Sequence, residues 1–129
     1  MSVRFVNIDR ETPMLFPEDM RSWLPEDHLV HFIVDAVSHI PMGAFKVNTR
    51  GTGSEQLPPE MMLALLVYSY ATGRFGSLTI EAATYTDIAM RYICAGVAHP
   101  DHSVICTFRK DNKEAFETAF TQVLWPLPL

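Results

Sequence analysis

Residues 57–108 read LPPEMMLALLVYSYATGRFGSLTIEAATYTDIAMRYICAGVAHPDHSVICTF, and this stretch decides the fold. It starts with two prolines, carries no charge from Met61 to Thr72, and reaches a glycine at Gly73. Proline is tolerated in the first turn of a helix, and glycine adopts the left-handed conformation that ends one. A helix that is apolar on all sides is a buried helix. The stretch therefore predicts a central buried helix that opens at Pro58 and Pro59 and stops at Gly73.

Three shorter helices are predicted after the central one. Serine, threonine and aspartate are favoured at helix N-caps because their side-chain oxygens accept hydrogen bonds from unpaired backbone N–H groups. We expect one helix from Ser77 to about Thr84, one over Asp87 to Cys94 capped by Thr86, and one that starts at Pro100-Asp101. Glu81 and Asp87 are interpreted as acids at helix starts. In the third helix the expected inward side chains are Val104, Ile105 and Phe108, and the expected outward ones are Ser103, Thr107 and Lys110.

The flanking sequence predicts further helices and no strand. Pro17 to Leu24 and a segment from Pro25 to Ile40 both begin with a proline followed by acids, which is typical of helix starts. Apolar residues recur in the second of these at helical spacing, namely Leu29, Phe32, Ile33, Ala36, Val37 and Ile40. We expect a packed turn at 42–45, an exposed loop at 48–56, and a last helix over 112–124 that buries Phe116, Ala119, Phe120 and Val123.

These elements predict an all-α fold with a single compact domain of about six or seven helices. The domain is expected to span residues 17–124, with an extended N-terminal arm at 1–16 and a tail at 125–129 that its prolines prevent from continuing the helix. Within it, the three short helices between residues 77 and 110 have the sizes of a helix-turn-helix unit. Short helix pairs also fill many all-α cores, so this spacing alone favours a structural role.

Composition limits the classes of function. The chain has 129 residues, its longest uncharged apolar stretch (61–73) is too short to span a bilayer, and it has two cysteines, Cys94 and Cys106. We therefore expect a soluble, cytoplasmic protein with no membrane contact and with reduced thiols. The formal net charge is −5, with eight acids and five bases before Pro59 and seven and five from there on. Any binding to DNA must therefore come from a local patch.

Three blocks of sequence resemble the N-terminal (InsH-like) domain of bacterial insertion-sequence transposases. The blocks are DRETPMLFPEDMRSWLPEDHLVHFIVDAV (9–37), RGTGSEQLPPEMMLALLVYSYATGRFGS (50–77) and IEAATYTDIAMRYICAGVAHPDHSVICTFRKDNKEAF (80–116). The resemblance implies a helical domain that recognises the terminal repeats of a transposon. In such transposases a following domain supplies three metal-binding carboxylates for strand cleavage and joining. We find no such domain in this sequence, so we expect a truncated, degenerate or excised transposase without enzymatic activity.

The resemblance implies a DNA-binding surface, which must use the cations that this chain retains. Family members often carry arginine or lysine where Leu78 and Thr79 stand, and the pattern Asp-His-x-Thr-Ile has valine at Val104 in place of threonine. Fewer phosphate donors therefore remain than in the family. The candidate DNA-binding residues are Arg74, Arg91, Ser103, Thr107, Arg109, Lys110 and Lys113, with Asn112 as a further neutral donor.

Other chemistry has weaker support in the sequence. Cys94, His99, His102 and Cys106 are close enough in sequence to suggest zinc, but no Cys-x-x-Cys or His-x3-His pair is present, and two buried thiols are the preferred interpretation. We therefore expect no metal and no cofactor. His28 is interpreted as a surface residue, and no nucleophile or general base is identified near it. The tyrosines are expected in the core, with their hydroxyls at its rim: Tyr68, Tyr70, Tyr85 and Tyr92.

A second class of function stays open. The acidic balance and the terminal Trp125 also suit a helical protein-interaction or dimerisation module, in which an exposed apolar patch binds a partner or a second copy of the chain.

Overall fold

The computed structural model describes residues 24–46, 57–96 and 98–124. Within these ranges the chain forms a single compact domain of six α-helices with no strand, as the sequence predicts. None of these helices is long and apolar enough to cross a membrane. The helices are α1 (Leu29–Ser38), α2 (Pro59–Ala71), α3 (Ser77–Thr86), α4 (Ile88–Ile93), α5 (His102–Asp111) and α6 (Lys113–Leu124).

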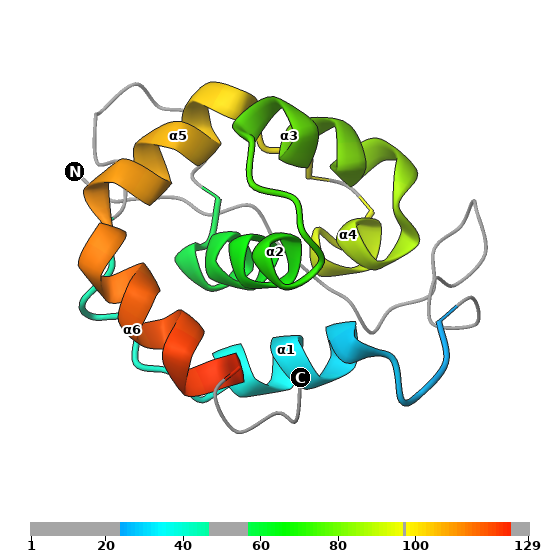
Figure 1. Ribbon diagram of the computed structural model, residues 1–129, viewed down its shortest axis with the longest axis horizontal. Helices are drawn as coiled ribbons and strands as arrows, with labels where there is room; N and C mark the ends of the chain where they lie inside the picture. The colour runs from blue at the N-terminus through cyan, green and yellow to red at the C-terminus, as the bar shows by residue number, and fades with distance from the viewer. Residues whose placement is uncertain (1–23, 47–56, 97, 125–129) are drawn as a thin grey trace.

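Helix α2 lies at the centre of the fold, with the other helices around it (Figure 1). Its residues from Met61 to Ser69 are all buried, which confirms the prediction from its uncharged sequence. The helix begins after Pro58 and is followed by Gly73 at a φ of 85°, in the left-handed region that glycine tolerates. The Arg74 N–H then donates a 2.7 Å hydrogen bond to the Ser69 carbonyl oxygen and closes the end of the helix.

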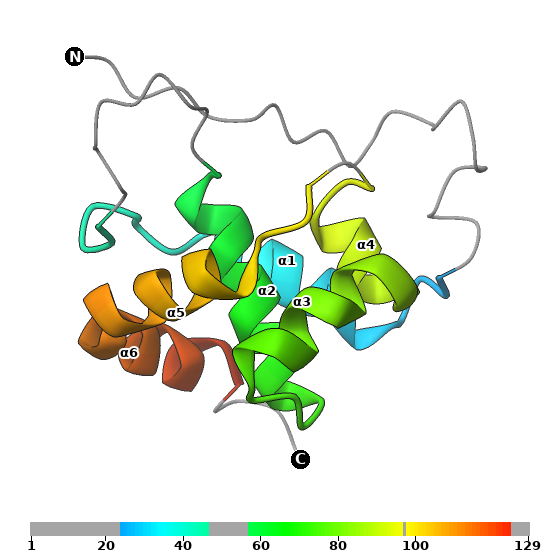
Figure 2. The same cartoon turned by 90° about the horizontal axis from the view of Figure 1, so that it is seen from above.

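The outer helices occupy two ends of the molecule. Helix α2 packs against α1, α4 and α6, while α3 packs against both α4 and α5. Figures 1 and 2 show α5 and α6 at one end and α4 at the other. A surface on α4 and a surface at the junction of α5 and α6 therefore lie at opposite ends of the molecule.

Helix α1 starts later than the sequence predicts. The segment from Pro25 forms a turn in which the His28 N–H donates to the Pro25 carbonyl oxygen (3.1 Å), and the helix begins at Leu29. His28 caps it, because its Nδ1 accepts a hydrogen bond from the Val30 N–H at 3.0 Å. The interpretation of His28 as a simple surface residue is therefore wrong. So is the inward placement of Phe32, which is 41% exposed, while the buried side consists of Val30, Ile33 and Val37.

Two predicted caps are also wrong, because neighbouring residues take their places. Gly76 precedes α3, and Ser77 is already its first helical residue. Thr86 is the last residue of α3, and the N-cap of α4 is Asp87, whose carboxylate accepts from the Met90 N–H at 3.1 Å. The assignment of Asp87 as an acid at a helix start is thus confirmed.

The remaining predictions fall into two groups. The turn at 42–45 is confirmed by a 3.0 Å hydrogen bond from the Phe45 N–H to the Met42 carbonyl oxygen, and the last helix begins at Lys113. That helix buries Phe116, Ala119 and Val123, with Phe120 partly buried. The predicted arm (1–16), most of the predicted helix Pro17–Leu24, the loop 48–56 and the tail 125–129 lie outside the described residues.

Candidate nucleic-acid interface

Helix α5 carries a continuous polar stripe on its exposed side. Ser103, Thr107 and Lys110 are all exposed, and their spacing of four and three residues places them on one face of the helix. The opposite face buries Ile105 and Phe108, as the sequence predicts. Val104 was expected to face inward as well, but it is 43% exposed.

The start of α5 is fixed by Asp101. Its Oδ1 accepts hydrogen bonds from the Ser103 N–H (2.6 Å) and from the Ser103 hydroxyl (2.9 Å). These bonds to the ionised form hold the pKa of the Asp101 carboxyl below its usual value. The Ser103 hydroxyl therefore donates within the protein, and its oxygen keeps the capacity to accept a hydrogen bond from a ligand.

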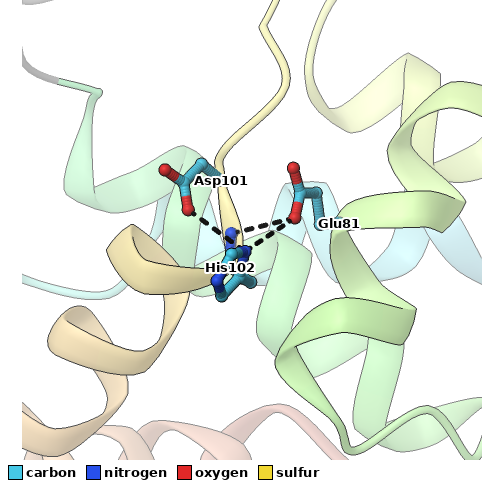
Figure 3. Close-up of side chains that lie close together, drawn as sticks. All are labelled: Glu81, Asp101 and His102. Carbon is cyan, nitrogen blue, oxygen red and sulfur yellow. Dashed lines mark hydrogen bonds and ion pairs between the residues drawn. The ribbon is translucent and has the colours of Figure 1, made fainter.

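A contact between α3 and α5 joins the same helix start to Glu81 (Figure 3). Glu81 Oε1 accepts from the His102 N–H at 3.2 Å and lies 3.1 Å from the His102 ring Nδ1. Glu81 lies in the middle of α3, so the expectation that it marks a helix start is wrong. The contact holds the first turn of α5 against α3 and thereby orients the polar stripe.

The carboxylates of Glu81 and Asp101 and the His102 imidazole also form the one group of three or more potential metal ligands among the described residues. Their ligand atoms lie within 4.8 Å of one another. However, both carboxylates already accept backbone hydrogen bonds, and the group lies at a helix N-terminus, where the helix dipole disfavours a cation. The geometry is that of a helix cap and a link between helices.

Two of the three candidate arginines form hydrogen bonds inside the protein. Arg109 Nη1 donates to the Phe75 carbonyl oxygen at 2.6 Å and to the Tyr70 hydroxyl at 3.1 Å. Arg74 Nη2 forms a 2.9 Å ion pair with Asp87 Oδ2. Both arginines thus fix the turn between α2 and α3 to its neighbours.

The other candidates differ in their positions. Lys110 and Lys113 are exposed at the junction of α5 and α6, beside the polar stripe, whereas Arg91 lies on α4 at the other end of the molecule (Figure 1). Asn112, a proposed neutral donor, is only 3% exposed. Its side chain bonds the backbone N–H and carbonyl oxygen of Lys46. The sequence did not identify Lys46 as a candidate, because nothing near it in the chain indicates a contact with a residue 66 positions away.

The candidate zinc ligands do not assemble into a site. No three of Cys94, His99, His102 and Cys106, all of which the structure describes, bring their ligand atoms within 4.8 Å of one another. Cys94 is buried, as preferred from the sequence, but Cys106 is exposed.

The tyrosines are only partly placed as predicted. Tyr68 and Tyr92 are buried and Tyr70 is half-buried, whereas Tyr85 is 56% exposed and stacks on His99 with ring centroids 3.8 Å apart.

Comparison with known protein families decides the class of this domain. A family model described as Transposase domain (DUF772) matches residues 18–111, which is more than half of the chain. The chain belongs to this transposase-domain family. Neither the curated proteins nor the solved structures contain a match.

The matched range of the transposase domain contains α1 to α5 in full and ends at the last residue of α5. The polar stripe, the two internally bonded arginines and Lys46 all fall within it. Lys113 and α6 follow the matched range, although α6 packs against α1, α2 and α5 of the transposase domain.

Proposed function

We propose that this transposase domain binds DNA during transposition and recognises the terminal repeats of its element through the exposed side of α5. Helices α3, α4 and α5 would then act as a helix-turn-helix-like unit in which α5 enters the major groove, which is wide enough for an α-helix. The domain would act in the cytoplasm, a reducing compartment that suits a chain in which no disulfide joins Cys94 and Cys106.

One observation carries the proposal. Ser103, Thr107 and Lys110 share the exposed face of α5, while Ile105 and Phe108 attach the other face to the core. Serine and threonine hydroxyls can hydrogen-bond to base edges, and lysine can pair with phosphate or with guanine. Helix α5 is therefore packed against the core on one side and presents two hydroxyls and one ammonium group on the other. We leave Arg91 out of this surface because α4 lies at the opposite end of the molecule.

The test is fluorescence anisotropy at low salt with a duplex of the element's terminal repeat and a scrambled duplex of equal length. We expect tighter binding to the repeat and a loss of affinity as salt rises, because each lysine–phosphate contact releases counterions from the DNA. The double variant Ser103→Ala/Thr107→Ala should reduce the preference for the repeat. Thr121→Ala, which removes an exposed hydroxyl from α6, outside the α3–α5 unit, serves as the control. Equal affinity of the wild type for both duplexes would contradict repeat recognition.

We propose no catalytic step for this chain by itself. Metal-dependent strand cleavage needs several carboxylates around two ions, and the described residues gather two carboxylates and a histidine that already cap and link helices. With magnesium or manganese present, the purified chain should neither nick nor join DNA. Cleavage that persists through repurification and disappears when acids of this chain are mutated would contradict the proposal.

A second candidate function is protein interaction through α3. Phe75, Leu78 and Tyr85 are each more than half exposed, and Ala82 lies between the last two on the same side of the helix. Such a side suits a contact with a second copy of the chain, because it carries no charge that would repel its equivalent. Sedimentation at several concentrations tests this function. A dimer that Leu78→Glu dissociates would favour it, and a monomer throughout would exclude a stable dimer.

A further inference from the structure

All three lysines of the chain line one groove. The groove has a volume of about 740 Å³ and lies between the segment 40–46, the end of α5 and one side of α6 from Lys113 to Gln122. Lys46, Lys110 and Lys113 belong to its lining, together with apolar side chains such as Ile40 and Phe45. Lys46 lies far in sequence from Lys110 and Lys113, so only the fold brings it beside them.

Asn112 fixes this arrangement. Its Oδ1 accepts from the Lys46 N–H, and its Nδ2 donates to the Lys46 carbonyl oxygen at 3.2 Å and to the Phe108 carbonyl oxygen at 2.9 Å. The rings of Phe45 and Phe108 stack beside it, with centroids 6.0 Å apart. The backbone at Lys46 is thus held against the junction of α5 and α6, on either side of which Lys110 and Lys113 lie.

The three lysines of the groove form no ion pair with another described residue. Two of the described arginines, Arg74 and Arg109, donate to acceptors within the protein. By contrast, no carboxylate of a described residue lies within 4.0 Å of a lysine ammonium group. Asp111 and Glu114 also line the groove, so its charged side chains sum to one positive charge on a chain of net charge −5. The N-terminus of α6, a helix of 12 residues, adds positive potential at Lys113.

We propose that this groove binds the sugar–phosphate backbone of DNA, with Lys46 as a phosphate contact from outside the α3–α5 unit and Asn112 as the residue that positions it. The inference rests on the proposed function, because the polar stripe on α5 leads through Lys110 to the groove. Phosphate oxygens pair with the lysines, and the apolar lining suits the carbon face of deoxyribose. Contacts of this kind fix a protein's position on a duplex without selecting its sequence.

The test is the salt dependence of binding to a short duplex of scrambled sequence, measured by fluorescence anisotropy. Each phosphate contact contributes about 0.9 to the slope of log K against log salt concentration. Lys46→Ala should therefore lower the slope by about 0.9, as Lys110→Ala should. Arg91→Gln removes the same charge from the opposite end of the molecule and should leave the slope unchanged. Removal of an acid from the groove, by Glu114→Gln, should strengthen binding.

The role of Asn112 is tested in a double-mutant cycle. Asn112→Ala should lower the slope nearly as much as Lys46→Ala does, and Lys46→Ala should have little further effect in that background. Circular dichroism checks that each variant is folded, and Asn112→Gln offers a milder change if the alanine variant unfolds. A full effect of Lys46→Ala in the folded Asn112 variant would overturn the positioning role.

The outcomes separate the inference from the proposed function. If the wild type binds DNA but Lys46→Ala leaves the slope unchanged, the inference is wrong and the proposed function stands. If the wild type binds no duplex even at low salt, the proposed function fails and the inference fails with it. A fluorescent oligoglutamate peptide completes the set: if it binds in a Lys46-dependent manner and the duplex does not, the groove is a site for acidic protein segments and the inference is wrong.

Discussion

Arg109 donates a 2.6 Å hydrogen bond to the backbone carbonyl oxygen of Phe75. The same guanidinium nitrogen donates to the hydroxyl of Tyr70, whose ring lies edge-on to that of Phe75 with centroids 5.3 Å apart. Arg109 therefore ties α5 to the turn between α2 and α3. Its neighbour Lys110 has its side chain in solvent. Two adjacent cations in the sequence thus have different roles in the structure.

The first prediction separates these two cations. Arg109→Ala should lower the free energy of unfolding by about 1–2 kcal/mol, because it removes a charged donor from a backbone carbonyl oxygen and a hydroxyl. It should leave the salt slope of DNA binding unchanged. Lys110→Ala should have little effect on stability and should lower the slope by about 0.9. Denaturant titration and fluorescence anisotropy measure the two effects.

Tyr70→Phe and hydrogen exchange provide the controls for this prediction. Tyr70→Phe deletes one acceptor of Arg109 but keeps the ring, so it should cost about 0.5–1.5 kcal/mol. In Arg109→Ala, backbone amides of the α2–α3 turn should exchange faster, whereas those of α4 should not. If Arg109→Ala kept the stability of the wild type but had a smaller salt slope, Arg109 would contact phosphate and not hold the α2–α3 turn.

The second prediction concerns the start of α4. Asp87→Ala should lower the free energy of unfolding by about 1 kcal/mol or more, because it removes both the cap to the Met90 N–H and the ion pair with Arg74. Thr86→Ala should cost less than about 0.5 kcal/mol, since the Thr86 side chain is exposed and its hydroxyl donates only to the Ala82 carbonyl oxygen within α3, at 3.4 Å. Thermal unfolding of the two variants at neutral pH makes the comparison. A larger loss of stability in Thr86→Ala than in Asp87→Ala would show that Thr86, and not Asp87, caps α4.

The third prediction tests the buried face of α5. Phe108→Ala should lower the free energy of unfolding by about 3–5 kcal/mol, because Phe108 is buried and stacks on Phe45. Val104→Ala on the same helix should cost less than about 1 kcal/mol, since Val104 is 43% exposed. Urea titration of both variants gives the difference. Similar losses would place Val104 in the core, as the sequence pattern suggests and the structure does not.

The predictable part of the fold is the part that local chemistry determines. The central helix could be predicted because its prolines, its uncharged run and Gly73 all lie in the helix or directly beside its ends. Which of two adjacent apolar residues faces inward was less predictable. Ile33 is fully buried and Phe32 is not, and Ile105 is buried while Val104 is not, because neighbouring helices decide the orientation of each helix. Helical periodicity alone does not determine how far each helix is rotated about its own axis.

The candidate site was predictable in its exposed residues and not in its bonded ones. Ser103, Thr107 and Lys110 are as exposed as their spacing suggests. The acceptors of Arg109 lie 34 and 39 residues away in sequence, so the arginine could not be recognised as an internal donor. For the same reason Lys46 was overlooked, since its position depends on Asn112, which is 66 residues distant.

The last prediction concerns the titration of His99. Burial of its ring, followed by the positive charge of Arg91, lowers the pKa of His99 below the usual value of 6.5. The Tyr85 ring covers the imidazole, stacked at 3.8 Å. Tyr85→Ala should therefore move the pKa of His99 toward 6.5, whereas Tyr85→Phe, which keeps the ring, should leave it in place. Histidine NMR signals followed through a pH titration report both values.

The sign of the accompanying change in stability follows from the lowered pKa. Between the pKa of His99 in the folded protein and 6.5, the unfolded chain binds more protons than the folded one. The contribution of His99 to the free energy of unfolding is therefore complete above pH 6.5 and is lost as the pH falls through the folded pKa. In Tyr85→Ala this loss should shrink, because the two pKa values approach each other. An equal loss on acidification in Tyr85→Ala and Tyr85→Phe would show that the stacked ring does not shield His99.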